Sequence, residues 1–264
     1  MIIDVHVHAR NGVSVKQLAR ACRAVGIEKV VYMGEPERVL RSAKEAPEFI
    51  IPFAHVDLDS VTPEEARRWM EQGIAGFKII SPLRNYDDEA YFPIYERLEA
   101  NGMIALFHTA VIAGSGSARQ KEMRASSLDM RPGLLDRIAR SFPDLVIVGA
   151  HLGYPWYLEA CSQMRWHRNV YFDTSTCQLT ARRPRYISEG PEESVKPYIR
   201  DLYLSGDLHP EKLLFGSDTF LDRENAVSVV DLAVRQHDVA LDDLAAPEEV
   251  RNDCLLYTSP SPRD

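Results

Sequence analysis

Short apolar runs rich in β-branched residues recur along the chain, and a helical pattern follows each one. The eight runs cover residues 2–8, 29–33, 49–57, 76–80, 103–108, 145–151, 170–173 and 213–218. The helical patterns cover residues 14–25, 35–46, 88–101, 132–142, 157–164, 192–204 and 223–237, with one more that begins at Thr62. Such apolar strands are typical of a parallel sheet that is buried on both faces. Eight strand–helix units in 264 residues therefore predict an α/β fold, a closed (β/α)8 (TIM) barrel with parallel strands, rather than an open doubly wound sheet.

Composition narrows the class of protein further. The net charge is -8 and no basic stripe is present, so we expect no nucleic-acid partner. No apolar stretch approaches the roughly 18 residues of a membrane span, and no secretory signal is visible. The four cysteines form no C-x-x-C pair, which suits a reducing compartment. We therefore expect a cytoplasmic protein that acts on a small molecule, as a monomer or a homo-oligomer.

The end of the chain differs from the rest. Residues 254–264 (CLLYTSPSPRD) have neither a helical nor a strand period and resemble a translated sequencing adapter. We expect residues 1–253 to form the barrel, truncated at its C-terminal end, and residues 254–264 to be a non-native tail. A truncated gene product without function is then an alternative to an enzyme.

Two histidines separated by one residue end the first apolar run, Ile2–His8. Because strand side chains alternate between faces, we expect Asp4, His6 and His8 on one face. The apolar side chains of Ile3, Val5 and Val7 would then lie on the other face. Two imidazoles on one face at the end of a buried strand can bind a single metal ion.

Polar residues also lie in or at the end of later runs: Lys78, His108, His151 and Asp218. In a parallel barrel the C-terminal strand ends meet at one rim, and active sites of this fold lie there. Imidazole nitrogens with a carboxylate oxygen suit zinc and other divalent first-row metals. The pattern therefore predicts a metal site at the C-terminal strand ends.

This series of residues resembles the amidohydrolase superfamily. The motifs FHT at 107–109, GAHLG at 149–153 and GSD at 216–218 are similar to its amidohydrolase-related (amidohydrolase 2) branch, which contains metal-dependent hydrolases and non-oxidative decarboxylases. The resemblance extends from Met1 to about Asp253. It implies one divalent ion, zinc by expectation, with His151 beside it and four ligands: His6, His8, His108 and Asp218. The wider superfamily implies an alternative in which a carboxylated Lys78 bridges two metals, with His108 and His151 on the second.

The expected chemistry follows from the metal site. A bound divalent ion can lower the pKa of its water to about 7 and so supply hydroxide at neutral pH. Asp218 would accept the proton and pass it to a leaving group, while His151 would stabilise an oxyanion or relay the proton. We therefore predict a metal-dependent hydrolase of an amide, lactone or ester. The alternative is a non-oxidative decarboxylase (a carbon–carbon lyase), in which Asp218 or His151 protonates the ring carbon as carbon dioxide leaves.

The substrate is predicted from residues near the rim. Two long loops at 109–129 and 174–190 carry several basic residues, among them Arg119 and Arg182. Because arginine binds carboxylates in a bidentate manner, we expect a small carboxylated substrate. Trp156 is a candidate for the pocket wall. Four histidines lie outside the pattern and receive no role: His55, His167, His209 and His237.

Overall fold

The computed structural model describes residues 2–9, 14–112, 126–175, 180–182, 193–220, 226–249 and 251. Nine parallel strand segments form one sheet in the order β10-β7-β6-β5-β4-β3-β2-β1-β11. Their bounds are β1 Ile2–His8, β2 Ile27–Gly34, β3 Ile50–Val56, β4 Gly76–Ile79, β5 Ile104–Phe107, β6 Val146–Gly149, β7 Val170–Asp173, β10 Leu213–Leu214 and β11 Thr219–Phe220. The predicted tail, residues 254–264, lies outside the described residues.

The sheet closes through the eighth predicted strand. This strand is divided into two halves, β10 and β11, instead of running unbroken over residues 213–218. The first half pairs with β7 and the second with β1. Between the two halves, the N–H group of Val5 donates to the carbonyl of Phe215 at 2.9 Å. The first and last strands are thus neighbours, and the prediction of a TIM barrel is confirmed.

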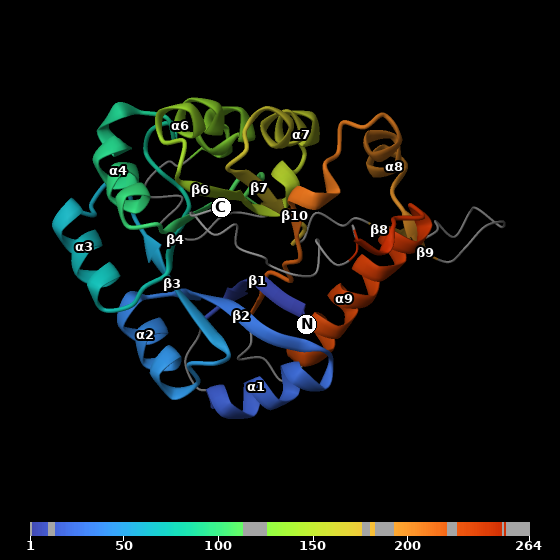
Figure 1. Ribbon diagram of the computed structural model, residues 1–264, viewed down its shortest axis with the longest axis horizontal. Helices are drawn as coiled ribbons and strands as arrows, with labels where there is room; N and C mark the ends of the chain where they lie inside the picture. The colour runs from blue at the N-terminus through green and yellow to red at the C-terminus, as the bar shows by residue number, and fades with distance from the viewer. Residues whose placement is uncertain are drawn as a thin grey trace.

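Helices surround the strands on the outside (Figure 1). They are α1 Val15–Ala24, α2 Pro36–Glu45, α3 Pro63–Glu71, α4 Phe92–Ala100, α6 Leu135–Ser141, α7 Tyr157–Trp166, α8 Pro197–Leu204 and α9 Ala226–Asp243. Short 3-10 segments are η1 Glu89–Tyr91, η2 Ser127–Met130, η3 Pro132–Leu134, η4 Ala150–Gly153 and η5 Pro210–Lys212. Within the described part of the chain, no helix is both long and apolar enough to cross a membrane.

Local sequence explains where α3 begins. The hydroxyl of Thr62 accepts from the N–H group of Glu65, and the Glu65 carboxylate accepts from the N–H group of Thr62, which is a capping box. The α8 helix departs from the prediction, since it begins at Pro197 rather than near residue 192. The preceding residues Glu193–Val195 form β9 instead, an antiparallel partner of β8 (Thr180–Arg182).

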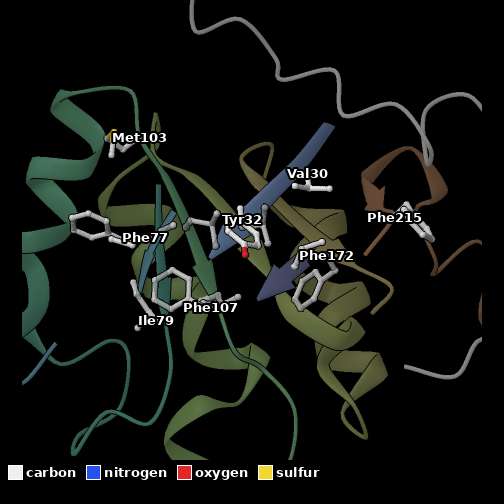
Figure 2. Close-up of a cluster of buried hydrophobic side chains, with 14 of the residues drawn as sticks. Val30, Tyr32, Phe77, Ile79, Met103, Phe107, Phe172 and Phe215 are labelled. Carbon is white, nitrogen blue, oxygen red and sulfur yellow. The ribbon is translucent and has the colours of Figure 1, made fainter. Parts of the chain in front are cut away.

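Two apolar layers lie on the two faces of the barrel wall. The outer layer joins the strands to the helices, and Figure 2 shows part of it, including Tyr32, Phe77, Phe107 and Phe172. The inner layer fills the barrel and consists of Val5, Val31, Met33, Phe53, Leu106, Val148, Ala150 and Leu214. Because these inner side chains are apolar, the polar site lies beyond them at the C-terminal strand ends.

A β-bulge interrupts β1. Asp4 pairs with Val30 and Val7 pairs with Tyr32, so the two residues between them, Val5 and His6, both lie opposite Val31. Val30 and Tyr32 belong to the outer layer, whereas Val31 belongs to the inner one. The expectation that Asp4 shares the face of His6 and His8 is therefore wrong, because a bulge breaks the alternation of side chains. The expectation that Val5 shares the face of Val7 is wrong for the same reason, since Val5 belongs to the inner layer and Val7 to the outer one.

Candidate metal centre

Two predicted histidine ligands lie close to one carboxylate oxygen of a third predicted ligand, Asp218. Oδ1 of Asp218 lies 3.3 Å from Nε2 of His6 and 2.9 Å from Nε2 of His8. All three ligand atoms lie within 4.8 Å of one another, a spacing that could hold a metal ion. The two histidines come from the end of β1, and the aspartate directly precedes β11, so barrel closure brings them together.

Charge at this cluster is set by burial and by the neighbouring rings. Burial lowers the pKa of His6 to about 4, with nearby Lys78 acting in the same direction, so this imidazole is neutral at pH 7. Burial alone would raise the pKa of Asp218, but the imidazoles of His6, His8 and His151 outweigh it and hold this pKa below its usual range. A neutral imidazole therefore faces an ionised carboxylate.

A second carboxylate lies behind His6. Oδ2 of Asp173 is 2.8 Å from Nδ1 of His6, and Asp173 is fully buried. Its other oxygen accepts from the N–H groups of His151, at 2.9 Å, and Ser175, at 3.0 Å, and from the Ser175 hydroxyl. Together with His6 and His151, Asp173 forms a second group whose ligand atoms lie within 4.8 Å of one another.

Sequence reasoning missed Asp173 and Ser175. Asp173 ends the seventh apolar run, so it carries the same signal that singled out Asp218, a polar residue at a strand end. Ser175 carries no such signal, because a serine just past a strand is common in loops.

His108 and His151 are in direct contact. Nδ1 of His108 lies 3.1 Å from Nε2 of His151, while Nδ1 of His151 lies 3.0 Å from the carbonyl oxygen of Ser175. Nε2 of His108 is buried and has no hydrogen-bond partner among the described residues. His108 belongs to neither of the two groups that could hold a metal ion. Its buried nitrogen is nevertheless the kind of unsatisfied atom that calls for a ligand.

Lys78 lies beside the first group. Its side chain is buried, and Nζ is 3.4 Å from Nε2 of His6. Burial lowers its pKa to about 8, so this amine is still mostly protonated at pH 7 but loses its proton more readily than an ordinary lysine.

The backbone at two site residues is in the left-handed region, where residues other than glycine are uncommon. The φ angle is 64° at His151 and 54° at Asp218. Strained backbone of this kind gathers at functional sites, where the surrounding structure holds it in place. Gly216 adds a close approach, since a Cβ atom there would lie 3.0 Å from Cβ of His6.

His55, which received no role from the sequence, also lies at the site. It is in β3 opposite Lys78, and its exposed ring meets the ring of His8 edge-on with centroids 5.4 Å apart. Burial lowers its pKa to about 3, and the neighbouring His8, Lys78 and His6 act in the same direction. The signal for it was the same as for Lys78, a polar residue within an apolar run.

Of the three residues predicted to bind substrate, only Trp156 has a described side chain. Arg119 lies outside the described residues, and only the backbone of Arg182, in β8, is described. Trp156 lines a groove of about 590 Å³ that includes Tyr157 on α7 and Tyr198 on α8. None of the cluster residues lines this groove, and the guanidinium of Arg131 lies 5.4 Å from the centre of the Trp156 ring.

Comparisons with known proteins agree with this fold. The chain matches the family model described as Amidohydrolase over residues 3–256. No curated protein sequence matches it.

Solved structures match along nearly the whole chain. An uncharacterised TIM-barrel protein of Bordetella bronchiseptica is 17% identical, with a TM-score of 0.65, covering 96% of this chain and 95% of that one. The 5-carboxyvanillate decarboxylase of Sphingomonas paucimobilis is 14% identical, with a TM-score of 0.60 and 96% coverage of both chains. A dihydroxybenzoic acid decarboxylase of Polaromonas sp. JS666, with bound manganese and the inhibitor 2-nitroresorcinol, is 13% identical, with a TM-score of 0.60, covering 96% and 94%. A dihydroorotase and a 4-oxalomesaconate hydratase share the same barrel.

Proposed function

Because the chain belongs to the amidohydrolase family, we propose that it is a metal-dependent carbon–carbon lyase, a non-oxidative decarboxylase of small aromatic or related acids. We propose one divalent ion, with His6, His8 and Asp218 as ligands and His108 as the fourth. His151 would stand beside the ion, within reach of the reacting atoms.

The approach of His6 to Asp218 carries the metal part of this proposal. Nδ1 of His6 donates a hydrogen bond to the carboxylate of Asp173, so Nε2 of the neutral His6 ring bears a lone pair. That lone pair lies 3.3 Å from Oδ1 of Asp218, which is also an acceptor. Two acceptors at this distance repel each other unless a cation lies nearby. Lys78 supplies one such positive charge. A divalent ion would supply a larger one and would also bind His8.

The chemistry of the donor set limits which ion fits. Imidazole nitrogen and carboxylate oxygen are ligands that suit zinc as well as other divalent first-row metals. The Polaromonas decarboxylase contains manganese. We therefore propose a divalent ion, with zinc, the expectation from sequence, and manganese as the two candidates.

Decarboxylation requires two things of the protein: it must neutralise the negative charge on the substrate and deliver one proton to the ring carbon. A bound divalent ion would neutralise the negative charge on the substrate oxygens. The bond between the carboxyl carbon and the ring carbon breaks, its electron pair stays on the ring carbon, and carbon dioxide leaves. Asp218 is partly exposed and ionised, so it would first accept a proton from water, which leaves as hydroxide, and then pass this proton to the ring carbon. His151 is the second group that could relay a proton in this way.

The predicted hydrolase remains the second candidate, because both reactions use the same ligands. Hydrolysis would need Asp218 to take the proton of a water molecule rather than to deliver one to carbon. What supports the lyase is that several of the matching solved structures are decarboxylases. At 13–14% identity these matches show a shared fold, and the choice of reaction is our inference.

Substrate profiling separates the two reactions. The purified protein, loaded with Mn²⁺ or Zn²⁺, would be incubated with 2,6-dihydroxybenzoate, 5-carboxyvanillate and a set of cyclic amides and lactones. We expect carbon dioxide release from at least one aromatic acid and none from Asp218→Asn. Ring opening of an amide or lactone without carbon dioxide release would favour the hydrolase instead.

A further inference from the structure

The positions of the ring hydrogens on three site histidines can be deduced from their acceptors. Nδ1 of His151 lies 3.0 Å from the carbonyl oxygen of Ser175 and 2.9 Å from the hydroxyl oxygen of the same residue. A backbone carbonyl only accepts hydrogen bonds, and the hydroxyl donates its one hydrogen to Asp173, so the hydrogen in these contacts belongs to Nδ1 of His151. A neutral imidazole carries one ring hydrogen. Nε2 of His151 is therefore an acceptor.

This acceptor determines the hydrogen on the next ring. Nε2 of His151 lies 3.1 Å from Nδ1 of His108, so the hydrogen between them belongs to His108. Nε2 of His108 is then left with a lone pair. That nitrogen is buried and has no partner among the described residues, as expected for an atom kept for a ligand.

Asp173 determines the hydrogen on the third ring. One oxygen of Asp173 accepts from two backbone N–H groups and from the hydroxyl of Ser175, and a carboxylate with so many donors is ionised. The other oxygen therefore accepts from Nδ1 of His6, at 2.8 Å. Nε2 of His6 also keeps a lone pair, directed at the side of the site where Asp218 and Lys78 lie.

We infer that Asp173 and Ser175, at the end of β7, are positioning residues that keep Nε2 of both His6 and His108 free of hydrogen. The side chain of Asp173 does this for His6, and the carbonyl of Ser175 does it for His108 through His151. The inference also assigns hydrogen bonds, rather than a metal ion, to the group formed by His6, His151 and Asp173. That the two nitrogens bind metal rests on the proposed function, whereas their hydrogen positions do not.

Nuclear magnetic resonance of the metal-free protein tests the hydrogen positions directly. Long-range ¹H–¹⁵N spectra of protein labelled with ¹⁵N-histidine distinguish the two neutral forms of each imidazole, and single substitutions assign the signals. We expect hydrogen on Nδ1 of His6, His108 and His151. Hydrogen on Nε2 of either His6 or His108 in the wild-type protein would overturn the inference.

Asp173→Asn tests the role of the carboxylate. The asparagine oxygen can still accept from the backbone, but its amide group presents hydrogens to His6, which must move its own hydrogen to Nε2. We expect this change in the His6 signal and a 10- to 100-fold weaker affinity for Mn²⁺ by calorimetry, the usual cost of losing such a partner. An unchanged His6 signal in the folded variant would contradict the assignment to Asp173.

Asp136→Asn is the matched control. It removes an Asp–His pair of the same length, 2.8 Å between Oδ1 of Asp136 and Nε2 of His167, away from the cluster. Asp136→Asn should change neither the His6 signal nor the affinity for Mn²⁺. An equal loss of Mn²⁺ affinity in this control would overturn the role given to Asp173. Should the wild-type protein bind no divalent metal, the proposed function fails while the histidine signals still decide this inference. Should Asp173→Asn not fold, the wild-type spectra decide it alone.

Discussion

The hydroxyl of Tyr86 donates a hydrogen bond of 2.9 Å to the backbone carbonyl of His108, which joins the aromatic core to a predicted metal ligand. The same hydroxyl lies 3.3 Å from the carbonyl of Ile79 at the end of β4. The ring of Tyr86 packs edge-on against Phe107, with centroids 4.8 Å apart. The outer apolar layer therefore holds the end of β5 in place from behind.

Tyr86→Phe should destabilise the protein without removing its metal. The change leaves two carbonyls without this donor in a buried setting, which costs about 1–2 kcal/mol of unfolding free energy. Denaturant unfolding measures this cost, and metal analysis after dialysis should give the wild-type content. A loss of metal at unchanged stability would show that the hydroxyl acts on the site rather than on the core.

His6→Ala and His108→Ala should each lose most of the bound metal. Each removes one nitrogen from a four-ligand set, and the remaining ligands compete poorly with water. Elemental analysis after dialysis measures the loss. His209→Ala is the control, because His209 pairs with Glu211 in η5, outside both groups that could hold an ion. Full metal content in both site variants would refute the proposed ligand set.

Asp218→Asn should fold and lose turnover, because asparagine can approach the ion but cannot accept a proton. His151→Asn should lower turnover severely while the metal stays bound, since His151 stands outside the one-metal ligand set. Circular dichroism, metal content and turnover distinguish the two effects. If His151→Asn lost half of the metal, the arrangement with a carboxylated Lys78 and two ions would be the better description.

Lys78→Met is a second test of the number of bound ions. In the one-metal arrangement Lys78 is a neighbour of His6 and not a ligand, so the variant should keep one ion per chain. Native mass spectrometry gives the stoichiometry. Loss of metal from the variant, together with a 44 Da carbon dioxide adduct on wild-type Lys78, would favour the carboxylated lysine.

His237 should make the protein less stable in mild acid. Burial lowers its pKa from 6.5 to about 4, so between these pH values the unfolded chain binds a proton that the folded chain does not. Stability therefore falls as pH decreases through this window. His237→Phe, which keeps a ring against Phe215, should gain about 2 kcal/mol relative to the wild type at pH 5 compared with pH 7.5. Equal pH dependence in the two proteins, measured by denaturant unfolding, would show that His237 has the same pKa in the folded and unfolded states.

Sequence patterns predict the barrel well because its strands are apolar and regularly spaced. They cannot predict the bulge at Val5 and His6, since an inserted residue in an apolar run leaves the local pattern unchanged. Asp4 consequently lies on the other face from the two histidines. The division of the eighth strand is hidden for a similar reason: pairing with β7 and then with β1 depends on closure of the whole barrel.

The site was predictable where a chemically distinctive residue ends a strand. His6, His8 and Asp218 come together as expected, because parallel strand ends share one rim. Asp173 and Ser175 were missed, since their importance lies in hydrogen bonds to rings that arrive from other strands. His55 was missed because a single histidine in a strand is common, and only the register with Lys78 brings it to His8.

The pairing of His8 with Asp218 spans 210 positions and joins the first strand to the interrupted eighth. An ion bound by both residues would link the first strand of the barrel to the last one. Bringing these two ends of the chain together costs conformational entropy. An ion that binds only when both strands are in place would stabilise the closed barrel relative to a state in which they separate. The divided strand thus places two ligands of the proposed ion where the first and last strands of the barrel meet.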